Sequence, residues 1–320
     1  VIHKAVVFEG QQELVSRKLR DFLCSLKTPT RIIPYSTVRS ATFTVCHDWE
    51  EQSWETTSSD ALPVATCLPL QIFDSIRAMG NLRSLTLIIH GFSSRQQNFF
   101  YGLLQNIEIQ AEFIRISASD CITRRVLEKS PQLQALHLPE CIDVTHFEPI
   151  FGRLRRLCAA VGRVESGGRI QFPTINEINL KKIAERYPCL EELVLREYSG
   201  FQGRNSISNI EAAMSAFDED FTKAIKIFRS MPGLKRVAID IDLDIAHLFC
   251  EGNRYKEDGF YTARLLRLAS CLPRLVQVGI INETPEYWTI TKESSGELTV
   301  YRGFSRLEGT VFPLSVNEGF

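Results

Sequence analysis

Three aspartates alternate with apolar residues in the C-terminal half of the chain: Asp240, Asp242 and Asp244. In an extended strand, this period of two places their carboxylates on one face. Together with Glu251 they match several ligand positions of a calcium-binding loop, but Ile245 stands where the sharp turn requires glycine. The pattern therefore favours an acidic strand face, and we expect neither a metal ion nor a bound cofactor.

Motifs for catalysis are missing from the sequence. None of the six histidines is spaced from another as an HExxH or HxH pair requires. No GxSxG elbow, GxxxxGK phosphate loop or GxGxxG fingerprint occurs. We therefore predict that the protein is not an enzyme and that it has no catalytic residues.

Composition narrows the class of partner and the compartment. Lys and Arg total 37 against 38 Asp and Glu, so the basic excess that binds nucleic acid is lacking. Apolar runs are too short for a membrane span. The nine cysteines are odd in number and form no CxxC pair, which predicts small buried thiols in a reducing compartment. We expect a cytoplasmic or nuclear protein without nucleic-acid or membrane partners.

The elements that must present any functional surface follow a repeated pattern of three apolar residues at positions i, i+3 and i+5. The clearest copies are Leu82-Leu85-Leu87, Leu133-Leu136-Leu138, Leu190-Leu193-Leu195, Leu234-Val237-Ile239 and Leu275-Val278-Ile280. Weaker copies are Ile2-Ala5-Val7, Val38-Ala41-Phe43, Ala111-Ile114-Ile116 and Leu154-Leu157-Ala159. This is the strand half of a leucine-rich repeat, in which neighbouring repeats must stack to bury their apolar edges.

Helical periodicity fills the intervals between these strands. The predicted helices cover residues 11–26, 70–79, 119–129, 174–187, 207–231 and 261–271. Several end at a proline just before the next strand, as at Ser130-Pro131 and Tyr187-Pro188. The predicted fold is an α/β leucine-rich-repeat solenoid, a horseshoe with a parallel concave sheet and outer helices.

A hairpin is predicted after the last repeat. Residues 287–290 and 298–301 flank Ser294-Ser295-Gly296, a turn signal between two short strands. An open solenoid end needs such a cover, so we predict an irregular leucine-rich-repeat domain over residues 1–281 and a C-terminal capping segment over 282–320.

The candidate binding residues are the polar side chains between the apolar ones, because strand alternation turns them to the concave face. Arginine is favoured at interfaces for its stacking and bidentate hydrogen bonds. The resulting partner-binding strip comprises His137, Arg156, Glu192, Arg196, Arg236 and Asp240. We expect it to bind a protein.

The N-terminal region resembles the segment just downstream of the F-box in fungal F-box proteins with degenerate leucine-rich repeats. The resemblance rests on the opening VIHKAVVF (1–8), a helix, and then YSTVRSATF (35–43), with repeat phrases such as SPQLQALHL (130–138) and YPCLEELVL (187–195). It implies the substrate-binding part of an F-box subunit of a cullin-type ubiquitin ligase. The Skp-type adaptor and the cullin would then be reached only through an F-box upstream of Val1, which is missing from this chain.

A second hypothesis is a leucine-rich-repeat scaffold or sensor unrelated to ubiquitination. Upstream sequence separates the two, since only the first requires an F-box before Val1.

Overall fold

The computed structural model describes residues 4–26, 37–46, 62–141, 152–162, 172–197, 210–241, 249–250, 254–281, 286–292 and 298–304. The chain divides into two compact units, Val1–Leu136 (unit 1) and His137–Gly319 (unit 2). The division falls inside strand β5 (Ala135–Cys141). The predicted boundary after residue 281 separates two strands of unit 2, so it does not coincide with this division.

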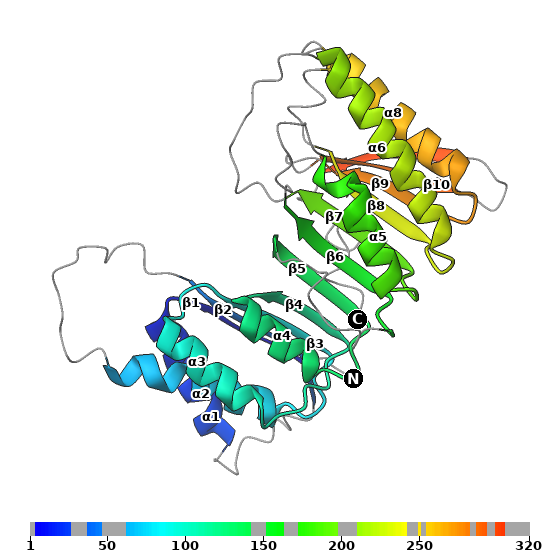
Figure 1. The fold of residues 1–320 in the computed structure, drawn as a ribbon. Coiled ribbons are helices and arrows are strands. Elements are labelled where there is room, and N and C mark those ends of the chain that lie inside the picture. Colours follow the sequence, from blue (N-terminus) through cyan, green and yellow to red (C-terminus); the bar gives the residue numbers. More distant parts are fainter. Residues whose placement is uncertain are drawn as a thin grey trace. The chain divides into compact units, whose positions relative to one another are not determined.

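Unit 1 alternates strands and helices. Its strands are β1 (Lys4–Gly10), β2 (Val38–Val45), β3 (Ser84–Ile89) and β4 (Phe113–Ser117), and its helices are α1 (Gln12–Leu26), α2 (Leu62–Ala78), α3 (Ser94–Leu104) and α4 (Asp120–Glu128). The four strands pair in parallel in chain order. The helices lie together on one face of this sheet (Figure 1).

Unit 2 continues the alternation and ends in a hairpin. Its strands are β6 (Arg156–Val161), β7 (Glu192–Glu197), β8 (Arg236–Asp240), β9 (Gln277–Ile281), β10 (Glu286–Lys292) and β11 (Leu298–Phe304). Its helices are the short 3-10 helix η5 (Pro173–Ile175), α5 (Glu177–Arg186), α6 (Ile210–Ser230) and α8 (Arg254–Cys271). Strands β6 to β9 pair in parallel in chain order, and β10 pairs antiparallel with β9 and β11. The predicted α/β architecture with a mostly parallel sheet and a C-terminal hairpin is confirmed.

The same tight turn joins helix to strand in both units. The backbone N–H of the first apolar residue of a strand pattern donates to the carbonyl oxygen three residues earlier, at distances of 3.0 to 3.3 Å. These pairs are Leu82–Met79, Leu133–Ser130, Leu190–Tyr187, Leu234–Met231 and Leu275–Leu272. Proline occupies the second position of the last four turns, where its fixed φ suits a β-turn. Helices α2, α4, α5, α6 and α8 are therefore each connected to the following strand by the same turn.

The second and third apolar residues of each pattern lie in the core between sheet and helices. Leu85 and Leu87 of β3, for example, are fully buried, and β3 alternates strictly between core and open positions. Register aligns these residues from strand to strand, as in Leu193↔Val237 and Val237↔Val278. The predicted strand phase is correct for the eight patterns from Val38 onward.

The predicted phase is wrong in β1. The pattern Ile2-Ala5-Val7 turned Val7 to the core, but the side chain of Val7 is 57% exposed and Phe8 is only 5% exposed. The Phe8 ring stacks on Phe43 of β2 with 5.3 Å between ring centroids. A one-residue shift exchanges the two faces of a strand, and the larger apolar area of phenylalanine decides which phase is adopted.

Helix α3 was not predicted, although its start carries a readable signal. Ser93 accepts a hydrogen bond from the backbone N–H of Gln96, and the Gln96 side chain accepts one from the backbone N–H of Ser93. This reciprocal capping box identifies a helix N-terminus even where apolar periodicity is weak.

The exposure of several cysteines contradicts a second prediction, namely that the thiols are buried. Eight are described as free thiols, but Cys24, Cys46, Cys67, Cys121 and Cys189 are exposed. Cys158 and Cys250 are buried as predicted. Apolar sequence neighbours therefore did not decide burial, because Cys67 is exposed within α2 and the other four exposed cysteines lie close to a helix end, a strand end or a turn.

A pair of substitutions tests the phase of β1. We expect Phe8→Ala to lower the free energy of unfolding by about 3 kcal/mol, since it empties a buried ring site. The neighbouring control Val7→Ala should change it by less than about 0.5 kcal/mol, because Val7 faces solvent. Urea unfolding followed by circular dichroism measures both. A larger loss for Val7→Ala than for Phe8→Ala would restore the original phase.

Candidate functional site

The predicted strip lies on the face of the unit 2 sheet opposite the helices. In β6, β7 and β8, Leu157, Leu193 and Val237 point into the helix-covered core and are fully buried. The residues that precede them must face the other way. Register places those three residues, Arg156, Glu192 and Arg236, side by side. We call this set the charged row.

An ion pair with a buried carboxylate forms the centre of the charged row. A terminal nitrogen (Nη2) of Arg236 lies 2.7 Å from Oε2 of Glu192, and the two side chains are 34% and 2% exposed respectively. Burial raises the pKa of Glu192 above its ordinary value, while the positive charges of Arg236 and Arg156 act in the opposite direction and offset part of that effect. Glu192 is therefore a counter-charge held within the protein, with almost none of its surface open to a partner.

Asp240 supplies a second buried carboxylate at the far end of β8. Its Oδ2 accepts a hydrogen bond from the backbone N–H of Glu197 at 3.3 Å. Its carbonyl oxygen accepts one from Oγ1 of Thr174 at 2.7 Å. Because Thr174 belongs to η5, these bonds tie the segment before α5 to the ends of β7 and β8. Asp240 thus acts as a structural junction.

The calcium-like pattern cannot be placed as a whole. Asp242, Asp244 and Glu251 lie outside the described residues. Among the residues that are described, no group of three or more His, Cys, Asp or Glu side chains could hold a metal ion.

Arg196 lies on the same strand face as Glu192, four residues further along β7, and is paired in register with Ala160 of β6. Its side chain is half-buried, and its Nε atom is buried without a hydrogen-bond partner. Within the described part of the chain, no carboxylate forms an ion pair with Arg196. On its other side, Arg196 has Asp240 of β8 as its neighbour, one residue beyond the register pair Leu195↔Ile239.

His137 is the one predicted site residue outside β6 to β8. It is buried in β5, at the first position of unit 2. The sequence prediction treated all six strip residues as available to a partner, but His137, Glu192 and Asp240 are almost closed to solvent. Alternation correctly gives the face of a side chain but not whether that face is open, so only the three arginines keep appreciable exposure.

Thr174 was missed as a site residue because the predicted helix 174–187 included it. The helix starts at Glu177, and the Asn176 side chain caps it by accepting from the backbone N–H groups of Ile178 and Asn179 at 3.0 and 3.2 Å. An asparagine followed by an acidic first turn is a readable helix start. This signal would have placed the start of the helix after Asn176 and left Thr174 outside the helix.

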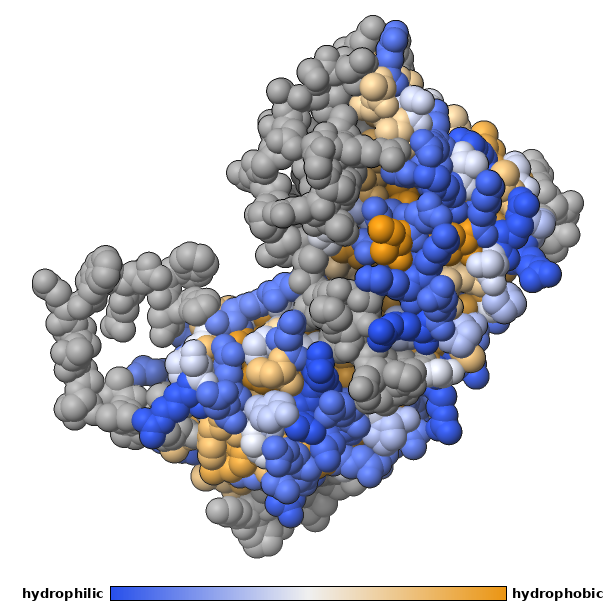
Figure 2. Space-filling view, in the orientation of Figure 1, coloured by the Kyte–Doolittle hydropathy of each residue, from blue (hydrophilic) through white to orange (hydrophobic). Residues whose placement is uncertain are grey.

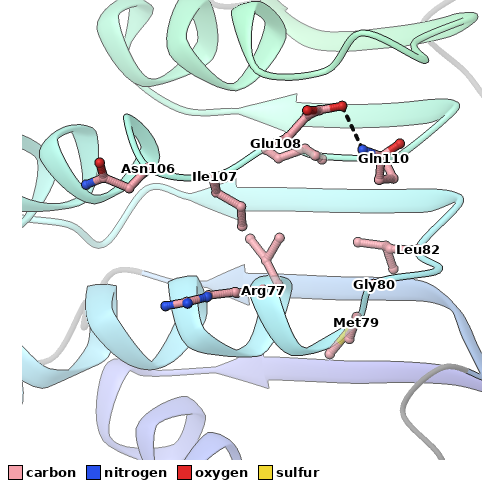
Figure 3. Close-up of a pocket in the computed structure, with 10 residues that line it drawn as sticks. Arg77, Met79, Gly80, Leu82, Asn106, Ile107, Glu108 and Gln110 are labelled. Atoms are coloured by element: carbon pink, nitrogen blue, oxygen red, sulfur yellow. Dashed lines mark hydrogen bonds between the residues drawn. The ribbon is translucent and has the colours of Figure 1, made fainter.

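Two cavities in the described structure provide no catalytic constellation. The first, in unit 1, has a volume of about 250 Å³ and lies between the end of α2 and the segment after α3. Figure 3 shows Glu108 and Gln110 on its wall, joined by a hydrogen bond of 2.7 Å, with Arg77 at the end of α2. It contains no nucleophile beside a base, so it lacks the arrangement that an enzyme active site needs.

The second cavity is a groove of about 500 Å³ between α5 and α6. Its charged groups neutralise one another: Lys181 lies 2.6 Å from Glu177, and Lys223 lies 2.7 Å from Glu219 and 3.8 Å from Glu177. Hydrogen bonds to these partners lower the pKa of Glu177 and raise the pKa of Lys223. This is an exposed network of ion pairs of the kind that contributes little to stability.

The helix-bearing surface is mainly hydrophilic, with an apolar spot over α5 (Figure 2). In α5, Ile178 is 57% exposed. Single exposed apolar residues are normal on protein surfaces and do not mark a binding site.

Comparisons with known proteins leave the chain without a family. No protein-family model matches it, and no curated protein matches it. Among solved structures, it is similar to the ADP complex of Bacillus subtilis pyridoxal kinase, at 9% identity over 73% of this chain and 68% of that chain, with a TM-score of 0.22. A TM-score of this size carries no argument about fold or activity. No helix within the described residues is long and apolar enough to cross a membrane.

Removing the cation of the buried ion pair should destabilise unit 2. Arg236→Gln leaves the Glu192 carboxylate buried without its partner, and we expect a loss of about 1 to 3 kcal/mol at pH 8. The control Lys235→Gln removes the exposed pair between Lys235 and Glu191, whose atoms lie 2.7 Å apart, and should cost less than about 1 kcal/mol. Urea unfolding provides the comparison, and equal losses would contradict a buried charge at Glu192.

The raised pKa of Glu192 predicts a pH dependence of stability. The unfolded chain ionises this carboxyl near 4.5, whereas the folded protein ionises it at higher pH. Its stabilising contribution is therefore full below pH 4.5 and is lost as pH rises through the folded pKa. The stability of Glu192→Gln minus that of the unsubstituted protein should increase over this interval. A decrease would mean that attraction to the two arginines outweighs burial.

Proposed function

We propose that this chain is a noncatalytic protein-recognition domain of the leucine-rich-repeat type, built as a horseshoe with a concave parallel sheet. The observation that carries the proposal is the alignment of equivalent residues on successive strands, as in Leu157↔Leu193↔Val237↔Val278. The repeated helix-to-strand turn supports it, because the same junction recurs at five places. Stacking of equivalent units is the defining property of such repeats.

Recognition suits this arrangement better than catalysis does. Aligned strands place side chains from successive repeats in continuous rows, so a partner can contact several repeats at once. The described cavities lack convergent reactive groups, whereas the sheet face carries charged side chains from three strands. Arginines on such a face suit contacts with a protein surface.

We further propose that the chain is the substrate-binding part of an F-box subunit of a cullin-type ubiquitin ligase. The support is the resemblance of residues 1–8 and 35–43 to the region downstream of the F-box in fungal F-box proteins. Contact with a Skp-type adaptor and a cullin belongs, in this proposal, to a segment upstream of Val1. The repeats themselves would select the protein to be ubiquitinated.

Affinity purification of the full gene product, with its native upstream sequence, tests this function. We expect a Skp-type adaptor and a cullin to co-purify with it in near-equal amounts, together with a protein whose half-life lengthens when the gene is deleted. Quantitative mass spectrometry and a translation-block chase provide these measurements.

Residues 1–320 alone serve as the matched comparison. They should retain the short-lived protein and lose the adaptor. Capture of a stable partner by the full gene product without any adaptor would favour a scaffold or sensor unrelated to ubiquitination. Capture of neither adaptor nor partner would reject the recognition role.

A further inference from the structure

A row of mostly small side chains crosses the sheet of unit 2 on the face opposite its helices. Each member directly follows the core-facing residue of its strand, so strand alternation turns it away from α5, α6 and α8, which lie on the other face (Figure 1). Register aligns the members from β6 to β10. This small row consists of Cys158, Val194, Ala238, Gly279 and Thr289.

The small row is closed to solvent. Val194 and Ala238 are fully buried, and Cys158 and Thr289 are each 3% exposed. The aligned positions in unit 1 are open by comparison: Val7 of β1 is 57% exposed, and its register neighbours in β2, β3 and β4 are partly exposed. Parallel strands that are buried on both faces have a second layer of polypeptide against them. The burial of the small row therefore indicates a cover on the face without helices.

Thr289 adds a polar group that requires a partner from this cover. Its Oγ1 atom is buried and has no hydrogen-bond partner among the described residues. Such a hydroxyl forfeits the hydrogen bond that it makes to water in the unfolded chain. A peptide group over the row would satisfy it, since a hydroxyl can both donate to a carbonyl oxygen and accept from an N–H group. Small neighbours also let a backbone approach closely, so the row suits an extended segment of polypeptide.

Residues 305–316, which lie outside the described residues, are the segment best placed to supply the cover. They follow β11, the strand that pairs with β10 and places Tyr301 beside Thr289. Their sequence SRLEGTVFPLSV contains an apolar run at its end, and such side chains gain free energy on leaving water. The connections after β6, β7 and β8, in contrast, must each carry the chain to a helix on the other face.

The length of this segment matches the row. From β11 to β6 the sheet has five intervals between neighbouring strands, or about 24 Å at the usual strand spacing. Residues 305–316 reach up to about 40 Å when extended. They can therefore cross every strand of the small row.

We propose that residues 305–316 dock as an extended strap on the small row and close this face of unit 2. Alternation in an extended segment places Phe312, Leu314 and Val316 on one side, and these side chains contact the row. The docking is a property of this chain alone. Its consequence rests on the recognition function proposed above: a partner that binds this face has to displace the strap.

Alkylation of cysteines in the full chain 1–320 tests the strap, because Cys158 belongs to the small row. Peptide mass spectrometry follows each thiol separately during reaction with iodoacetamide. Cys250 is an internal control, since it is also buried but lies outside the row, near Arg264 of α8. We expect both thiols to react slowly in the unsubstituted protein.

Substitutions within the strap should open the row. Phe312→Asp combined with Leu314→Asp should accelerate alkylation of Cys158 at least about tenfold, because carboxylates are unfavourable against a buried apolar face. Alkylation of Cys250 should stay within about twofold. The matched control, Ser315→Asp combined with Asn317→Asp, adds the same charge on the other side of the segment and should leave Cys158 protected.

Circular dichroism shows whether each variant is folded, and Val316→Asp alone decides the question if the double variant is not. Rapid alkylation of Cys158 in the unsubstituted protein would show an open row and overturn the proposal. Slow alkylation of Cys158 in the folded Phe312→Asp, Leu314→Asp variant would assign the cover to another part of the chain. Equal acceleration at Cys158 and Cys250 would mean that the substitutions loosen the whole unit, and would also reject the strap.

Competition with a partner is measured separately. The full gene product with Phe312→Asp and Leu314→Asp should capture several-fold more of the short-lived protein than the unsubstituted gene product does. Unchanged capture by a variant whose Cys158 reacts rapidly would reject the competition. Loss of the partner from both proteins would contradict the recognition function and not the strap, which alkylation detects without any partner.

Discussion

Parallel pairing of equivalent residues is the constraint on which the other features depend. Parallel strands all begin at the same end of the sheet. After each strand, the chain must therefore return to that end before the next strand can begin. The repeated turn does this: residues 79–83, 187–191, 231–235 and 272–276 each separate a helix from the following strand. With the return fixed, the apolar residues of successive strands come into register and form one layer against the helices.

The buried ion pair is a consequence of the same register. Glu192 lies between two arginines because Arg156, Glu192 and Arg236 hold equivalent positions on three strands. A carboxylate that is nearly inaccessible to water would be unfavourable alone, and the positive charges on both sides make its burial tolerable. The repeat thus converts three separate sequence positions into one electrostatic unit.

Sequence periodicity predicted most of the fold because the strand pattern reports burial directly. From Val38 onward the apolar triplets give the correct face of each strand, and the sequence Ser294-Ser295-Gly296 predicted the antiparallel pair that β10 and β11 form. The phase of β1 was wrong, since Val7 and Phe8 are both apolar and only packing against Phe43 distinguishes them. The charge composition of the site was predictable from alternation. The burial of His137, Glu192 and Asp240 was not, because it depends on atoms far away in sequence.

The connections at the two ends of the strands differ in how much their lengths vary. At the end of the strands to which the helices return the chain, five connections share one short turn, and residues 27–37 and 105–112 form longer connections. At the opposite end they range from the single residue between β1 and α1 to residues 46–61 before α2, and residues 198–209 before α6 and 241–253 before α8 are also long. Functional variation concentrates in such connections when a rigid scaffold positions them. The end of the strands with the more variable connections is also the end near which Arg196, Asp240 and Thr174 lie. Binding specificity can therefore change there without disturbing the strand register that maintains the fold.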